Sequence, residues 1–362
     1  MERIILVYWN KSTGPEPIIQ YPPEKSFPPK DLFLKIWAKH ELNKENSIIE
    51  FLHEESNYHF TSIIQKFEGE IYFLVLVYNK KNMCENIIKD SPDILAIISR
   101  NLVELINTNK ITRAISEAFN TIINYSKLDE EDNLISFFQD RIKFTILKIL
   151  RNGVISKLEL TNILRQEYGF STINIDLLLI SFIQENLIIK ENIPGIKECY
   201  FLIKDLSSTR IPPKNLPNEQ IEEKVLRKYK KALIKFFINY DSVTDIENKT
   251  ILQTAILDKD VFSLLKMLRK KRLSVDESLN ILNNKHDLFT ELIEKKFIYE
   301  AKGFVYSFSD VHFIKFTPFY IIERLVNRYK DQEISSDEYL THLELLIDQL
   351  EKHPSYVNYE II

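Results

Sequence analysis

The stretch IYFLVLVY, residues 71–78, decides how the first part of the chain folds, because it is apolar at nearly every position. A strand with one face in water alternates apolar and polar residues, whereas a strand buried on both faces reads as one apolar run. The stretch therefore predicts the central strand of a sheet that is covered on both faces.

Strands and helices are predicted around this run in the order ββαβββαα. Glu68-Gly69 is typical of a hairpin turn, and the apolar residues after Phe27 recur at helical spacing. The predicted elements are strands over residues 3–10, 18–21, 47–53, 58–67 and 70–79, and helices from Phe27, from Ser91 and over residues 112–125. Together they form an α+β domain over residues 1–127 with a five-stranded sheet.

The short second strand lies in GPEPIIQYPP, residues 14–23, where prolines stand on both sides of it. A proline cannot donate to a strand ladder, so this strand is expected at an edge of the sheet. Edge prolines discourage unwanted pairing, but an open edge can also accept a partner's strand. The candidate partner-binding residues are Ile18, Ile19, Gln20 and Tyr21, with Phe33 and Trp37 on the next helix, for which core packing is the alternative.

The rest of the chain repeats one pattern, three helices and then a β-hairpin, which is the element order of a winged helix. A capping box, S-x-x-E, starts the second helix of each copy at Ser156 and Ser274, and the hairpins turn at Gly195 and Gly303. The predicted segments are an acidic, solvated linker over 128–133, a winged helix over 134–210, a proline-bearing linker over 211–220, a long helix with a second winged helix over 219–316, and a helical pair over 318–353.

Catalytic and metal-binding motifs are absent from the sequence. No phosphate-binding loop, dinucleotide motif, serine-nucleophile elbow, H-E-x-x-H or C-x-x-C occurs. The seven histidines are dispersed. His53 and His59 lie six residues apart with Glu54 and Glu55 between them, and a partly exposed hairpin is a simpler interpretation than a metal site. We therefore expect no enzyme activity, metal or cofactor. Cys84 and Cys199 form no disulfide framework, the net charge is −4, and no apolar run reaches the roughly 18 residues of a membrane span. These features, and a start unlike a signal peptide, predict a cytoplasmic protein.

The first 125 residues resemble the longin family in the order of their elements. The closer resemblance is to the longin domain of nitrogen permease regulator 2-like proteins, where a first strand also leads to Gly-Pro, a short strand and a Tyr-x-x-Pro-Glu-like segment. Here these are Gly14-Pro15 and residues 20–24, QYPPE. Those proteins also continue into winged helices. The resemblance implies binding to a small GTPase and to another longin or roadblock-type subunit, or to a second copy of this chain.

The catalytic role of those proteins does not carry over. They stimulate GTP hydrolysis with an arginine in the loop before the last longin strand, whereas the matching loop here, residues 66–70 (KFEGE), has no arginine. An arginine finger works by placing fixed positive charge on the transferring phosphoryl group, which glutamates cannot do. We therefore expect GTPase binding without this contribution to hydrolysis.

Winged helices can also bind DNA, but the charge pattern argues against it. Residues 134–210 hold ten Lys and Arg against eight Asp and Glu, and residues 258–315 hold eleven against nine. The third helix of the first copy, residues 172–186, has no basic residue, although a helix in the major groove needs donors for phosphates and base edges. Its apolar character indicates a buried or protein-facing helix.

Basic residues gather on two other predicted helices. The first group is Arg227, Lys228, Lys230 and Lys231 with Lys224 and Lys235; the second is Arg269, Lys270, Lys271 and Arg272 with Lys266. A solvated helix face is the simplest interpretation. Contact with anionic lipid head groups, with an acidic partner or with nucleic-acid phosphates is the alternative.

These observations predict a non-enzymatic regulator or scaffold of a small GTPase that acts through a longin-like domain within a complex. The first alternative is a winged-helix transcription regulator whose longin-like domain dimerises. The second is a membrane-trafficking adaptor built from tandem winged helices, as in ESCRT-II.

Overall fold

The computed structural model describes residues 1–43, 48–53, 58–79, 92–125, 130–170, 174–214, 222–242, 244–352 and 359–362. The fold is α+β, as predicted. By its contacts the chain divides into two units, the first of Met1–Asp129 with Thr161–Asn186 and the second of Glu130–Leu160 with Leu187–Ile362.

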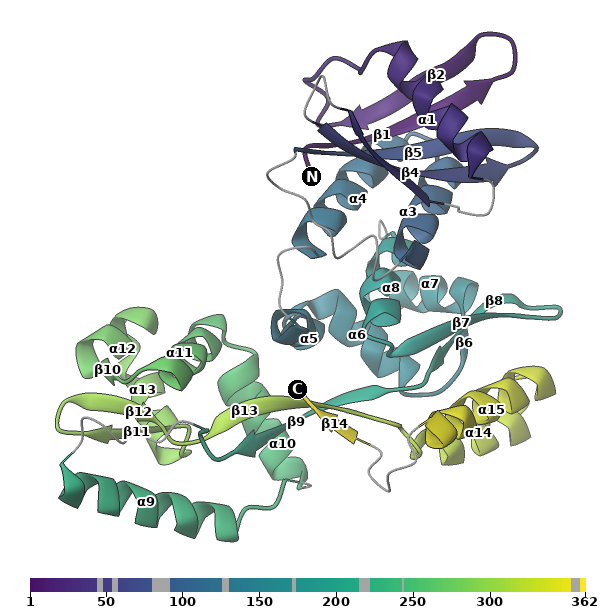
Figure 1. Cartoon of the computed structure of the whole chain (residues 1–362). Coiled ribbons are helices and arrows are strands. Elements are labelled where there is room, and N and C mark those ends of the chain that lie inside the picture. The colour runs from purple at the N-terminus through teal and green to yellow at the C-terminus, as the bar shows by residue number, and fades with distance from the viewer. Residues whose placement is uncertain are drawn as a thin grey trace. The chain divides into compact units, whose positions relative to one another are not determined.

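The first unit is built on a five-stranded antiparallel sheet in the order β2-β1-β5-β4-β3 (Figure 1). The apolar run of residues 71–78 lies in β5, the middle strand, so the prediction of a central strand is confirmed. The strands are β1 (Arg3–Asn10), β2 (Gly14–Tyr21), β3 (Ile48–His53), β4 (Tyr58–Phe67) and β5 (Glu70–Asn79). β2 is longer than predicted, because it starts at Gly14.

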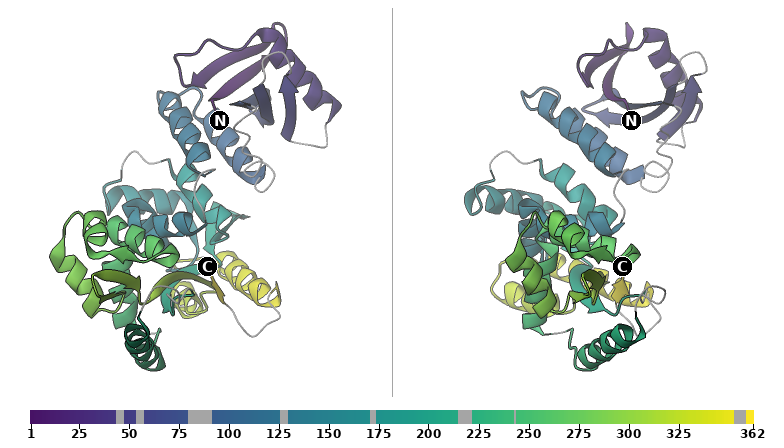
Figure 2. Two further views of the ribbon diagram at one scale, coloured as in Figure 1. Left: turned by 60° about the vertical axis from the view of Figure 1, so that its left-hand side comes forward. Right: turned by 90° about the vertical axis from the view of Figure 1, so that its left-hand side faces the viewer.

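Helices cover both faces of this sheet (Figure 2). Val75 and Val77 of β5 face the cluster that contains Phe33 of α1, whereas Leu74 and Leu76 face the cluster made with α3 and α4. Because successive strand residues point to opposite faces, one strand serves two cores, and this explains why it is apolar throughout. The helices are α1 (Lys30–Leu42), α3 (Pro92–Glu104) and α4 (Ile111–Tyr125).

A further helix, α8 (Ile175–Gln184), belongs to the first unit although it comes from the first copy of the repeat. Its Leu177 and Ile180 join the cluster of α3 and α4. Asn101 of α3 donates from Nδ2 to the carboxylate of Asp176 at 2.9 Å. The prediction that this helix is buried or faces protein is confirmed.

The two copies of the repeat match residue by residue in their first part. Residues 140–164 (DRIKFTILKILRNGVISKLELTNIL) align without a gap with residues 258–282 (DKDVFSLLKMLRKKRLSVDESLNIL). Asp140 and Asp258 hold the same place, and each accepts two backbone N–H bonds at the start of a helix.

Copy 1 is α6 (Arg141–Leu150), β6 (Ile155–Ser156), α7 (Lys157–Gln166), α8, β7 (Ile188–Ile193), β8 (Lys197–Leu202) and β9 (Asp205–Ile211). Copy 2 is α11 (Lys259–Lys270), β10 (Leu273–Ser274), α12 (Val275–Ile281), α13 (His286–Glu294), β11 (Ile298–Ala301), β12 (Phe304–Ser307) and β13 (Asp310–Phe316).

Small sheets recur in the same order, β6-β8-β7 in copy 1 and β10-β12-β11 in copy 2. The sequence did not predict the last strands of the copies, β9 and β13, which pair with each other antiparallel. Ser208 stands opposite Phe313, and each is the fourth residue of its strand, so this strand pair has a local two-fold symmetry. The other side of β13 pairs with β14 (Tyr359–Ile361).

An arginine–aspartate clamp closes each copy within the second unit. Arg151, at the end of α6, binds both carboxylate oxygens of Asp205 at 3.0–3.1 Å and donates to the carbonyl of the next residue at 3.0 Å. Arg269 of α11 binds Asp310 at 2.5 Å and donates to the following carbonyl at 2.8 Å. The clamp therefore fixes the end of each first helix to the start of β9 or β13.

The acidic stretch over 128–133 is helical from Glu130 onward, so the prediction of a solvated linker is wrong there. It begins α5 (Glu130–Gln139). Glu131 accepts two hydrogen bonds of 2.7 Å from Arg269, and Asp132 accepts one of 2.8 Å from Lys266. Because the cations lie up to 138 residues later in the chain, local composition did not reveal these pairs.

A helix from outside each copy covers its hairpin. Tyr229 donates its hydroxyl to the carbonyl of Ser307 at 2.7 Å, and His342 Nε2 donates to the carbonyl of Leu202 at 3.0 Å. Ser307 and Leu202 end the equivalent strands β12 and β8, so the two covering helices bind the same carbonyl of the two copies. The covering helices, all predicted, are α9 (Glu223–Ile238) before copy 2, and α14 (Ile321–Lys330) with α15 (Ser336–Lys352) after it.

Candidate functional site

The predicted docking strand forms one edge of the first unit's sheet. Among the described residues, β2 pairs with β1 alone. Ile18 is 41% exposed, whereas Ile19 and Tyr21 are partly buried against the core of α3 and α4. Gln20 as a whole is only 6% exposed, so its side-chain amide is not accessible to a partner. Ile18 is thus the most exposed of the four predicted residues.

Phe33 and Trp37 of α1 are packing residues. Phe33 is fully buried, so its prediction as a partner-binding residue is wrong and the alternative of core packing is correct. Trp37 is partly buried and stacks on Trp9, with ring centroids 4.1 Å apart and an angle of 14° between the planes. Such stacking stabilises the contact between α1 and β1 beyond the area that it buries.

The turn between β4 and β5 is the hairpin that the sequence predicts at Glu68-Gly69. Glu70, just after it, accepts a hydrogen bond from the hydroxyl of Tyr8 at 2.9 Å. That bond is the main reason why the pKa of Tyr8 is raised, and burial adds to it. This turn thus presents the carboxylates of Glu68 and Glu70 and contains no arginine.

The first predicted basic group lies on the outer face of α9. Its exposed members are Lys224, Arg227, Lys228, Lys230, Lys231 and Lys235. Arg227 forms an ion pair with Glu223 at 2.5 Å, but the two side chains are 78% and 77% exposed, so water screens the pair strongly. Ile234 and Ile238, which the sequence analysis did not single out, are 56% and 76% exposed on the same helix.

The second predicted basic group is not one free surface, and the prediction is wrong for Arg269. Its guanidinium binds the carboxylates of Glu131 and Asp310. Although burial works in the opposite direction, these carboxylates raise the pKa of Arg269. The remaining predicted members are the exposed Lys270 and Lys271 and the half-buried Arg272.

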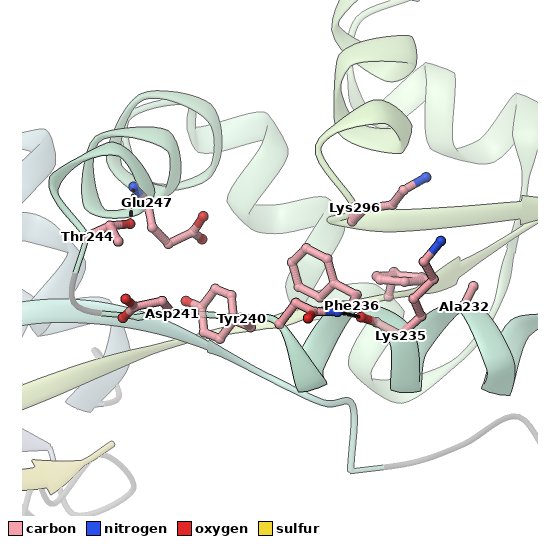
Figure 3. A pocket seen from close by; sticks show the side chains of 10 residues that line it. Ala232, Lys235, Phe236, Tyr240, Asp241, Thr244, Glu247 and Lys296 are labelled. Atoms are coloured by element: carbon pink, nitrogen blue, oxygen red, sulfur yellow. Dashed lines mark hydrogen bonds between the residues drawn. The ribbon is translucent and has the colours of Figure 1, made fainter.

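A pocket of about 600 Å³ opens beside the C-terminal half of α9, next to α10 (Asp245–Ile251) (Figure 3). It joins residues from distant parts of the sequence, and no motif predicted it. Figure 3 shows cations at one end, carboxylates at the other and aromatic rings between them. These residues are Lys235 and Lys296, Asp241 and Glu247, and Phe236 and Tyr240.

Arg210 of β9 supports this pocket from within the second unit. Its side chain is 4% exposed and donates to Glu247 at 2.5 Å and to the carbonyl of Lys295 at 2.7 Å. The guanidinium also lies 4.8 Å from the ring centroid of Phe236 and 4.6 Å from that of Phe297. Because Glu247 forms an ion pair with this buried cation, its carboxylate holds the pocket wall in place.

Possible metal ligands and thiols can be located only among the described residues. The described residues hold no group of three or more His, Cys, Asp or Glu placed to bind a metal ion. The glutamates between His53 and His59 lie outside the described residues, as does Cys84. Cys199 is buried, and burial raises the pKa of its thiol to about 12, so it carries no reactive thiolate. No described helix is both long enough and apolar enough to cross a bilayer.

No protein-family model and no curated protein matches the chain. Among solved structures, a crystal structure of the bacterial selenocysteine-specific elongation factor EF-Sec was found at 11% identity and a TM-score of 0.13. The match covers 97% of this chain and 51% of that chain, so this chain spans about half of its length. At such a TM-score the similarity carries no argument about fold or function.

Proposed function

We propose that the protein is a non-enzymatic scaffold or regulator that binds a small GTPase through its first unit, within a complex. The observation that carries the proposal is the sheet order β2-β1-β5-β4-β3, with α1 on one face and α3 and α4 on the other. This arrangement agrees with the ββαβββαα order of the longin family. The open edge of β2 is the element that a partner's strand would extend.

The two repeats support assembly with proteins better than binding to DNA. The helix of copy 1 that would enter a groove, α8, packs against α3. In copy 2, Lys285 lies 3.4 and 3.5 Å from Asp258 and Asp260, and Lys295 binds Glu291 at 2.5 Å. These contacts occupy the donors that DNA phosphates would need, so we read the copies as winged helices that serve protein packing.

The proposal includes binding to the GTPase without catalysis of hydrolysis by this chain alone. The turn between β4 and β5 has Glu68 and Glu70 in place of an arginine. An arginine finger contributes about 10³–10⁵-fold to GTP hydrolysis, and carboxylates at this place would repel the phosphoryl group instead. The purified chain should therefore leave the hydrolysis rate of a bound GTPase unchanged.

A capture experiment with a matched pair of variants tests this function. Ile18 on β2 and Leu52 on β3 are both 41% exposed and lie on opposite edges of the same sheet. The full immobilised chain is incubated with native lysate that contains GDP or a non-hydrolysable GTP analogue, and bound proteins are identified by mass spectrometry. We expect a small GTPase whose capture falls about tenfold or more with Ile18→Lys and is unchanged with Leu52→Lys. Absence of a GTPase, or an equal loss with both variants, contradicts the proposal.

A further inference from the structure

We propose that the outer face of α9 binds the surface of an anionic lipid bilayer. This surface belongs to the second unit and does not depend on GTPase binding by the first. Three features of α9 favour such binding: the charge that it exposes, the apolar side chains on the same face, and the contacts that hold its inner face.

The exposed charge of α9 is strongly one-sided. Six cations stand along the helix against one carboxylate, Glu223, which lies in its first turn. The whole chain has a net charge of −4, so this density of cations is a local property of the helix. Each Lys or Arg close to an anionic membrane surface contributes about 1 kcal/mol of attraction, so such a group is sufficient for reversible binding.

Two isoleucines lie on the same face, toward the C-terminal end of the helix. Residues spaced by three or four positions line one side of a helix, and Arg227, Lys231, Ile234 and Ile238 follow this spacing. At exposures of 56% and 76%, the isoleucines leave most of their apolar surface in water in the isolated protein. A helix that combines cations with exposed large apolar side chains can lie in the head-group region of a bilayer.

The helix is already folded and oriented before any ligand arrives. Its inner face buries Tyr229 against Tyr306 and Phe308, and the Tyr229 hydroxyl donates to a carbonyl of copy 2. At its first turn, Glu222 pairs with Lys302 of the hairpin between β11 and β12. Figure 1 shows α9 along this hairpin, with α11 to α13 on the other side of it. Binding therefore does not have to meet the cost of forming the helix, as it would for a free peptide.

The isoleucines distinguish a bilayer from a nucleic acid. Phosphates of DNA or RNA would satisfy the cations but would offer nothing to Ile234 and Ile238. A bilayer offers anionic head groups to the lysines and the start of the acyl chains to the isoleucines. Removing the isoleucines should therefore weaken binding to lipid and leave purely electrostatic binding intact.

Vesicle binding by the full chain tests the inference. The probes are vesicles of phosphatidylcholine alone and of phosphatidylcholine with about 30% phosphatidylserine, at about 0.1 M salt. We expect binding to the second kind only. The double variant Lys228→Glu/Lys231→Glu should weaken it about a hundredfold or more, because four units of charge change at the surface. Ile234→Ser/Ile238→Ser should weaken it about tenfold or more while the net charge stays the same.

Two controls separate loss of membrane binding from a change in net charge or in stability. Lys148→Glu/Lys249→Glu changes the net charge equally at exposed positions of α6 and α10, and we expect binding close to that of the unmodified chain. Unfolding curves of the isoleucine variant should match the unmodified chain, because both side chains are exposed. No binding to anionic vesicles, an isoleucine variant that binds them equally well, or tighter binding to a random-sequence DNA duplex than to vesicles would each overturn the inference. Tight capture of an acidic protein without vesicle binding would do so too.

Discussion

In copy 1 of the repeat, Asp205 accepts a hydrogen bond from the hydroxyl of Tyr320 at 2.7 Å as well as the bonds from Arg151. In copy 2 both clamp residues have an additional partner, because Arg269 also binds the carboxylate of Glu131 and Asp310 also accepts a hydrogen bond from Nε2 of His312 at 3.1 Å. The two clamps therefore share their geometry and differ in what they attach. The first holds the segment that leads into α14, and the second holds α5.

The neighbouring contacts follow the same division. Arg324 and Arg328 of α14 donate to the carbonyls of Arg151 and Val154 in copy 1, at 2.6 and 2.7 Å. Gln139 of α5 donates to the carbonyl of Ile256, just before copy 2, at 2.7 Å. A repeated module can thus keep the contacts that close its own fold while its outward contacts bind different segments of the chain.

Among substitutions that distinguish the two copies, Arg269→Met should lower the stability of the protein most. It leaves Glu131 and Asp310 without their guanidinium at side-chain exposures of 16% and 7%, which should lower the free energy of unfolding by about 3–5 kcal/mol. Arg151→Met should cost less, because it leaves one carboxylate without its guanidinium whereas Arg269→Met leaves two. Urea unfolding of the full chains, followed by circular dichroism, gives both values.

The matched control for these variants is Arg227→Met, which removes a guanidinium from a solvated pair and should change stability by less than about 0.5 kcal/mol. Neutralising both carboxylates in Arg269→Met, with Glu131→Gln and Asp310→Asn, should restore part of the loss. A larger loss for Arg151→Met than for Arg269→Met would show that the additional partners do not matter.

Gly153→Ala should have the next largest effect, and only in copy 1. Gly153 has φ of +107°, and a Cβ there would lie 2.6 Å from Cδ2 of Leu325 of α14. The same place in copy 2 holds Lys271, with an ordinary φ of −156°. We expect a loss of about 2–3 kcal/mol in thermal or urea unfolding. Gly303→Ala has a similar positive φ and open space, so it should cost only about 1 kcal/mol. Equal losses would mean that α14 does not pack there.

Acid should weaken the contact of α15 with copy 1 and leave the contact of α9 with copy 2 unchanged. This effect should be smaller than those of the substitutions above. Burial lowers the pKa of His342 to about 4, whereas that of Tyr229 is raised, away from the acid range. The unfolded chain therefore takes up a proton near pH 6.5 that the folded chain resists. Stability from His342 is present above pH 6.5 and falls by about 2 kcal/mol on going to pH 5.

His342→Gln tests this contribution, because an amide can still donate to the Leu202 carbonyl but cannot titrate. The free energy of unfolding of this variant should depend on pH less steeply than that of the unmodified chain between pH 6.5 and 5. Tyr229→Phe should keep the steep dependence. Comparing variants removes the contribution of His40, whose pKa burial also lowers to about 4, and that of His312, whose pKa Asp310 raises. Parallel pH curves for all three chains would rule out His342 as the sensor.

Sequence patterns were sufficient to predict a helix or strand where one local signal determines its position. The continuous apolar run of β5 placed the central strand, and the serines of the capping boxes placed the starts of α7 and α12. Sequence patterns were insufficient where the environment of a residue depends on a segment far away in the chain. Glu131 is a surface residue by composition and becomes half of a partly buried pair only when Arg269 contacts it. Phe33 was ambiguous because helical spacing shows which face is apolar but not what covers that face.

The pairing of β9 with β13 has the form of a subunit interface, with equivalent residues face to face across a local axis. In an assembly of separate subunits such a contact would dissociate on dilution, and each substitution would occur on both sides at once. Here one polypeptide carries both halves, so the contact forms at any concentration of protein. Each half is also free to change alone, which is how a histidine and a tyrosine can serve the same carbonyl in the two halves.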